Sequence, residues 1–157
     1  MDTLQFFQTI LPATGLYYLA TISKPKPKSK KPKQTHHFSY TTLEELAEGV
    51  SEHNENPSAD VYHACSSYRE PFVVVKGARA FRVTENRVGA KALWVDLDCG
   101  QEKFDTGKGY IDQATACAAV KEFCTTNNFP APMYINSGNG VHCYWPFTSA
   151  TLCLYIL

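Results

Sequence analysis

The sequence lacks several features that would assign a protein to a class at once. It contains no run of about 18 apolar residues, the length that a membrane-spanning helix needs. Its six cysteines include no C-x-x-C pair, which argues against a zinc ribbon. Asp2 stands where a secretory signal has basic residues, and Gln5, Gln8 and Pro12 interrupt the first apolar stretch, so a secretory signal is not indicated. We therefore expect a cytoplasmic protein with reduced cysteines and no membrane partner.

The sequence also lacks a net charge, because it has 15 basic and 15 acidic side chains. A protein-wide positive field, which would favour nucleic-acid binding, is thus not expected. One segment differs, since residues 24–33 hold six lysines among repeated prolines. Lysines repel one another and prolines lack an amide donor, so this segment predicts an exposed loop. The loop is either a solvated connector, an arm that contacts nucleic-acid phosphates, or a nuclear-localisation segment.

What is present is an ordinary globular composition, with 44% apolar and 19% charged residues in a chain of 157, which suits one domain. Thr42 and Glu45 have the spacing of a capping box, ahead of apolar residues at helical spacing. Periodicity predicts helices over 4–10, 43–54 and 112–126, and strands over 16–22, 60–65, 92–98, 133–136 and 141–145, with an extended segment around 72–75. This order predicts an α+β fold, a mixed or antiparallel sheet with helices packed on one face.

The expected core of the second half combines the strands with one helix. The buried stripe of helix 112–126 is predicted to be Ala116, Ala119, Val120, Phe123 and Cys124. The unbroken apolar run Ala92-Leu93-Trp94-Val95 predicts a central strand that is buried on both faces.

Two carboxylates, Asp96 and Asp98, end that apolar strand. Successive strand side chains alternate, so both point to one face, roughly 7 Å apart at the backbone. Two carboxylates about 5 Å apart repel by around 3 kcal/mol at an effective dielectric constant of 20. Bound Mg²⁺ or Mn²⁺ would turn this repulsion into chelation, because hard oxygen ligands suit these ions. The alternative is that Asp98 caps a turn with Gly100 while Asp96 faces solvent.

A glycine-rich turn that leads to a histidine forms the second motif, over residues 137–142. Asn139-Gly140 is a strong hairpin signal between the two flanking strands. Gly138 and Gly140 allow positive φ angles and a close approach to a ligand. The turn amides, with the Ser137 hydroxyl, could receive phosphate oxygens, and His142 could donate to a triphosphate. The alternative is an ordinary hairpin with a histidine in its strand.

Together these motifs resemble those of the archaeo-eukaryotic primase superfamily, specifically the primase-polymerase domains of phages and plasmids. The first family motif is an apolar strand that ends in D-x-D, matched by Asp96 and Asp98. The second is a small residue, any residue and then histidine, matched by Gly140-Val141-His142. The prolines before this hairpin and the Tyr144-Trp145-Pro146 exit are also similar. The similarity covers roughly residues 5–148.

The resemblance implies an RRM-like fold and metal-dependent nucleotidyl transfer from an NTP or dNTP to a 3′-hydroxyl on a DNA template. Asp96 and Asp98 would hold Mg²⁺ or Mn²⁺, and His142 would contact the phosphates of the nucleotide. Arg79, Arg82 and Lys103 are further candidates for phosphate contacts. The implied partners are nucleoside triphosphates, the DNA template and a replicative helicase module, in the cytoplasm of a bacterial or phage-infected cell.

The chain departs from the family pattern after the hairpin. The third family motif is a strand with another metal-binding carboxylate, but residues 148–157 contain no Asp or Glu. We therefore expect a partial domain over 1–148 and an atypical truncated tail over 149–157, inactive as this chain. No helicase P-loop motif is present either.

Two other functions remain open. The first is a non-catalytic nucleotide- or DNA-binding remnant of the same fold. The second is a haloacid-dehalogenase-type phosphatase, in which an apolar strand also ends in D-x-D. Such phosphatases usually have Thr or Val where this chain has Gly100, need a later lysine and acidic pair, and leave His142 without a role.

Overall fold

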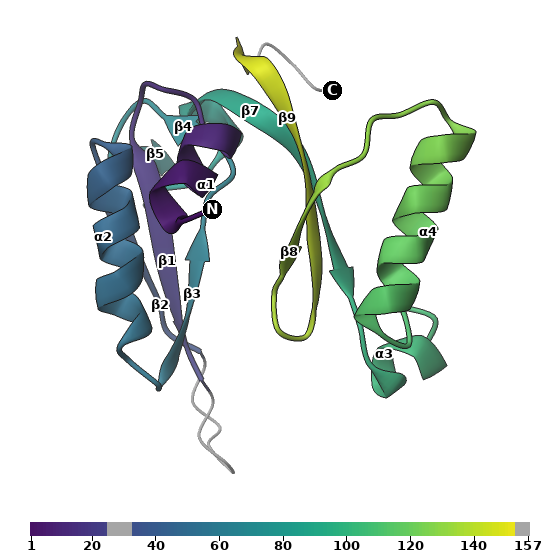
Figure 1. The fold of residues 1–157 in the computed structure, drawn as a ribbon. Coiled ribbons are helices and arrows are strands. Elements are labelled where there is room, and N and C mark those ends of the chain that lie inside the picture. The colour runs from purple at the N-terminus through teal and green to yellow at the C-terminus, as the bar shows by residue number, and fades with distance from the viewer. Residues whose placement is uncertain (25–32, 153–157) are drawn as a thin grey trace. The chain divides into compact units, whose positions relative to one another are not determined.

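Helices and antiparallel strand pairs follow one another along the chain, so the α+β class predicted from the sequence is confirmed (Figure 1). The computed structural model describes residues 1–24 and 33–152. The lysine-rich loop predicted over 24–33 lies almost wholly outside the described residues. The sequence predicts one domain over 1–148, whereas the contacts divide the chain into two units. Met1–Lys91 with Thr148–Leu157 make the first unit, and Ala92–Phe147 make the second.

The first unit contains a three-stranded antiparallel sheet, ordered β2-β1-β3. Its strands are β1 (Tyr17–Ser23), β2 (Thr35–Tyr40) and β3 (Ala59–His63), of which β2 is not predicted from the sequence. Helix α2 (Leu43–Asn54) contacts all three strands and also α1 (Thr3–Ile10). The shorter elements are β4 (Ser67–Tyr68), the hairpin of β5 (Val73–Val75) and β6 (Ala78–Ala80), and the 3-10 turn η1 (Thr84–Asn86).

Side-chain caps fix where the helices begin. The Glu45 amide donates to Thr42 Oγ1 at 3.1 Å, and the Thr42 amide donates to Glu45 Oε2 at 3.2 Å, so the predicted capping box is confirmed. Asp2 and Gln5 make the same reciprocal pair at the start of α1. These side chains satisfy amides that have no partner inside the helix. Within the described part of the chain, no helix is long and apolar enough to cross a membrane.

The second unit combines the end of one strand with two helices and a hairpin. Its elements are β7 (Arg87–Asp98), which begins in the first unit, α3 (Gln101–Asp105), α4 (Gln113–Thr126), β8 (Met133–Asn136) and β9 (Gly140–Leu152). The strand order is β4-β7-β9-β8, with β8 and β9 antiparallel. The predicted hairpin is therefore confirmed, whereas α3 is not predicted from the sequence.

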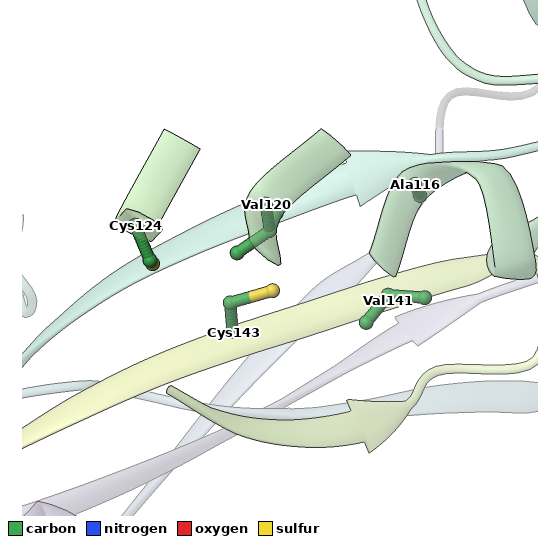
Figure 2. Close-up of a cluster of buried hydrophobic side chains, with 5 residues drawn as sticks. All are labelled: Ala116, Val120, Cys124, Val141 and Cys143. Atoms are coloured by element: carbon green, nitrogen blue, oxygen red, sulfur yellow. The ribbon is translucent and has the colours of Figure 1, made fainter. Parts of the chain in front are cut away.

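One buried cluster joins α4 to the hairpin. Figure 2 shows Ala116, Val120 and Cys124 of α4 facing Val141 and Cys143 of β9. Three residues of the predicted helix stripe are thus confirmed as buried, and Ala119 is half-buried.

The prediction for Phe123 is wrong, because its side chain is 54% exposed. Its ring contacts Phe129, 6.3 Å away between centroids, beyond the end of the helix. The contact with Phe129 replaces burial against the strands, and helical periodicity alone does not reveal it.

Burial of Cys143 makes the stability of the second unit sensitive to alkaline pH. Burial, with smaller contributions from Cys117 and Cys124, raises the pKa of the Cys143 thiol from 9.0 to about 11. The folded state therefore favours the protonated thiol, and this stabilisation is complete below pH 9 and lost as the pH rises towards 11. We expect the free energy of unfolding of this unit to fall by about 3 kcal/mol over that range.

Urea unfolding followed by tryptophan fluorescence measures this effect. Both tryptophans of the chain, Trp94 and Trp145, belong to the second unit, so the signal reports on that unit. The Cys143→Ala variant should lose most of the pH dependence. A residual slope is expected from Cys99 and Tyr134, because burial also raises the pKa of each of these groups. An identical slope in the variant and the wild type would contradict the assignment to Cys143.

Candidate functional site

Asp96 and Asp98 lie at the end of β7, on the face that is turned away from α4. The residues that alternate with them, Leu97 and Cys99, pack against the buried cluster under α4. The strand pleat therefore directs both carboxylates to the opposite face, as predicted from their spacing. Their side chains are half-exposed, at 52% and 50%.

The strand before these carboxylates is less buried than its sequence predicts. Leu93, Trp94 and Val95 are 44%, 53% and 36% exposed, so the prediction of burial on both faces is wrong. The physical reason is that the buried cluster under α4 does not extend to this part of the strand. Among the described residues, the cluster under this helix takes in Leu97 and Cys99 of the strand region but none of residues 93–95. An apolar run therefore reaches the candidate site with its side chains accessible to solvent.

The hairpin brings His142 to the first of the two carboxylates. Val141 and Cys143 are buried under α4, so His142 between them points to the carboxylate face of the strands. Its Nε2 lies 3.4 Å from Asp96 Oδ1. The His142 ring is edge-on to the buried Tyr144 ring, with centroids 6.3 Å apart, which restricts its orientation. The two sequence motifs thus meet at one place, although Asp96 and His142 are 46 positions apart in the sequence.

The second carboxylate pairs with a lysine from α3. Lys103 Nζ donates to Asp98 Oδ2 at 2.7 Å, and both side chains are about half-exposed. The hydrogen bond to Asp98, followed by the charge of that carboxylate, raises the pKa of Lys103. Gly100 is the N-cap of α3, and its amide donates to the Tyr110 carbonyl at 2.8 Å. The sequence names Lys103 only as a possible phosphate contact, because α3 is not predicted.

The glycine-rich turn is held by contacts within the chain. Gly138 has a φ of +90°, as its residue type predicts. The Ser137 amide donates to the Gly140 carbonyl at 3.1 Å, and the Gly138 amide donates to Asn136 Oδ1 at 2.8 Å. These two amides therefore already have partners, and only an exchange of partners would offer them to a phosphate. The Ser137 side chain is on the exposed part of the turn.

Hydrogen bonds from the Gln113 side chain connect this turn to the start of α4. Its Nε2 lies 2.9 Å from Asn136 Oδ1, 3.3 Å from the Gly138 carbonyl oxygen and 3.1 Å from the Gly140 carbonyl oxygen. The sequence gives no signal for this role, since a glutamine at the start of a helix is common. Gln113 thus links the helix to the hairpin that carries His142.

Gly140 has a different role from the one predicted. It is not among the glycines with positive φ in the described residues. Instead, a Cβ atom at this position would lie 2.2 Å from the Leu97 carbonyl oxygen and 3.4 Å from Asp98 Cα. The missing side chain lets β9 approach the backbone of β7, rather than a ligand. This close contact lies two residues before His142 on β9.

The arginines named from the sequence belong to the first unit, whereas the other candidate residues belong to the second. The Arg79 guanidinium lies over the Phe72 ring, 4.4 Å from its centroid. The positive charge of Arg82 acts with burial, the larger cause, to lower the pKa of His37.

The donor set of the site suits a hard divalent cation that keeps part of its water shell. Asp96 and Asp98 offer carboxylate oxygens on one face, and both already attract positive or potentially positive groups, His142 and Lys103. Mg²⁺ is commonly bound by one or two carboxylates together with waters and substrate phosphates. Within residues 1–24 and 33–152, no group of three or more His, Cys, Asp or Glu side chains is arranged to hold a metal ion by itself.

The chemistry of the site is therefore that of two accessible carboxylates with an imidazole and an ammonium group beside them. Such a set can bind a cation and, next to it, an anionic ligand. Accessible apolar side chains at residues 93–95 adjoin it along β7. No protein-family model, curated protein or solved structure matches this chain.

Proposed function

We propose that the second unit carries the metal- and nucleotide-binding site of a primase-polymerase-type nucleotidyltransferase. In this reaction a nucleotide is transferred from an NTP or dNTP to a 3′-hydroxyl on a DNA template. The observation that carries the proposal is the 3.4 Å distance between His142 Nε2 and Asp96 Oδ1. It joins a pair of metal-type carboxylates to a histidine on a glycine-rich turn, which the phosphatase alternative does not use. An antiparallel sheet with α4 on one face is compatible with an RRM-like core.

In this proposal each side chain has a separate task. Asp96 and Asp98 would hold Mg²⁺ or Mn²⁺. The bound ion would neutralise phosphate charge and activate the attacking hydroxyl. His142 would donate a hydrogen bond to a phosphate oxygen, while Asp96 and the Tyr144 ring orient the imidazole. Ser137, at the exposed turn, and Lys103, which pairs with Asp98, are further candidates for phosphate contacts.

The internal pairing of both carboxylates favours a second candidate function. Asp98 is paired with Lys103 and Asp96 lies beside His142, so both carboxylates have partners within the chain itself. A non-catalytic module would then bind nucleotide or DNA without synthesis.

Binding of dATP in the presence and absence of Mn²⁺ tests the shared site. We expect the His142→Ala variant to bind Mn²⁺ alone as the wild type does and to bind dATP with Mn²⁺ at least about 10-fold more weakly, because it loses a hydrogen bond to a charged group. Calorimetry measures both affinities, and His142→Gln, which keeps a donor, should lose less. Failure of the wild type to show Mn²⁺-dependent dATP binding would reject the proposal.

Primer extension with labelled dNTPs and Mg²⁺ or Mn²⁺ separates the two candidate functions. Labelled product that depends on the template identifies a transferase. Mn²⁺-dependent dATP binding without product, from the same protein preparation, identifies the binding module.

A further inference from the structure

Lys103, in the second unit, forms an ion pair with Asp98, one of the two carboxylates that the proposed function assigns to a metal. We infer that Lys103 neutralises Asp98 while no divalent cation is bound, and moves to the triphosphate of the nucleotide when the cation takes its place. This inference rests on the proposed function and adds to it an exchange of partners by Lys103, from Asp98 to the triphosphate. The residues that carry it are Lys103, Asp98 and the loop that joins them.

The loop fixes the backbone of Lys103 beside the end of β7. The Gly100 amide donates to the Tyr110 carbonyl at 2.8 Å, and the Tyr110 amide donates to the Asp98 carbonyl at 2.9 Å. The Lys108 amide donates to the Lys103 carbonyl at 2.9 Å. A Cβ atom at Gly109 would lie 2.4 Å from the Asp98 carbonyl oxygen, so the returning chain packs directly on this strand end. The starting point of the lysine side chain is thus held in place.

The lysine head group, by contrast, is held only by an exposed ion pair. Its Nζ lies 2.7 Å from Asp98 Oδ2, with the two side chains 46% and 50% exposed. Exposed pairs of this kind contribute little to stability, so a divalent cation can readily displace the ammonium. The lysine side chain has a flexible four-carbon stem, which lets the charge move while the backbone stays fixed.

The charges explain why the ammonium would then meet the nucleotide. Asp96 and Asp98 together carry two negative charges, which a divalent cation balances without help from Lys103. A triphosphate that binds together with the cation adds negative charge beside these two carboxylates. The released ammonium stays close to the carboxylates, because the loop of residues 99–110 holds the backbone of Lys103 beside them. Lys103 should therefore oppose binding of the cation alone and favour binding of the cation with the triphosphate.

The test measures two affinities that should change in opposite directions. For Lys103→Met we expect Mn²⁺ alone to bind about 2- to 5-fold more tightly, from loss of an exposed competing ion pair. The same variant should bind dATP in the presence of Mn²⁺ at least about 5-fold more weakly. Mn²⁺ binding is measured by electron paramagnetic resonance, and dATP binding by calorimetry at saturating Mn²⁺.

Two variants complete the design. Lys103→Arg keeps the charge and should restore most of the dATP affinity. Lys121→Met removes a positive charge from the exposed part of α4 in the same unit and should leave both affinities unchanged. Lys103→Met affinities that stay equal to wild type, or that both move in the same direction, would overturn the inference while the proposed function stands. A wild type that binds no Mn²⁺, or whose Mn²⁺ affinity is unchanged by Asp98→Asn, would overturn both.

Discussion

Replacing Asp96 and Asp98 together by asparagine is expected to abolish Mn²⁺ binding and Mn²⁺-dependent nucleotide binding. Asparagine keeps the shape of each side chain but removes both negative charges, which supply the main attraction for a hard cation. Loss of residues that only orient metal ligands already costs about 10- to 100-fold in metal affinity, so loss of two direct ligands should exceed about 100-fold. Electron paramagnetic resonance of free Mn²⁺ in a titration measures this loss.

The fold should survive this double substitution. Both carboxylates are half-exposed, and the exposed ion pair of Asp98 contributes little to stability. Tryptophan fluorescence in urea should therefore give an unfolding midpoint close to that of the wild type. Glu122→Gln, which removes a negative charge from the exposed side of α4, is the matched control and should bind Mn²⁺ normally. Normal Mn²⁺ affinity in the double variant would disprove the metal assignment.

The Gly140→Ala variant is expected to lose at least about 3 kcal/mol of stability in the second unit, at the upper end of the cost of overpacking. The added Cβ would lie 2.2 Å from the Leu97 carbonyl oxygen, and both partners are strand backbone that cannot turn aside. The strands β7 and β9 must therefore separate at this point. Since His142 is two residues further along β9, its Nε2 should also move away from Asp96 Oδ1, which lies 3.4 Å from it in the wild type.

Gly138→Ala is the control for this prediction, because it makes the same chemical change in the same turn. Gly138 has a φ of +90° but no neighbour within 4 Å of an added Cβ, so only backbone strain of about 1–2 kcal/mol is expected. Urea unfolding followed by tryptophan fluorescence compares the two variants. The close contact of β7 and β9 would be refuted by a Gly140→Ala variant as stable as Gly138→Ala.

Features that depend on local sequence were predictable. The capping box of Thr42 and Glu45, the helix over α4 and the hairpin of β8 and β9 follow from spacing and turn chemistry. The shared direction of Asp96 and Asp98 follows from strand alternation in the same way. Elements with weaker local signals, among them β2, β4 and α3, were not predicted. Because α3 was not predicted, the pairing of Lys103 with Asp98 was not foreseen, although the sequence named Lys103 as a possible phosphate contact.

The sequence by itself therefore determined the α+β class and the identity of the two motifs, because strand and helix periods and glycine turns are properties of neighbouring residues. Only the tertiary structure decided that His142 lies beside Asp96, that Lys103 pairs with Asp98, and that Gly140 serves strand packing. It also decided the exposure of residues 93–95, since the length of strand that α4 covers depends on how helix and strand pack. These are contacts between distant parts of the chain, and their distances depend on packing that no local pattern contains.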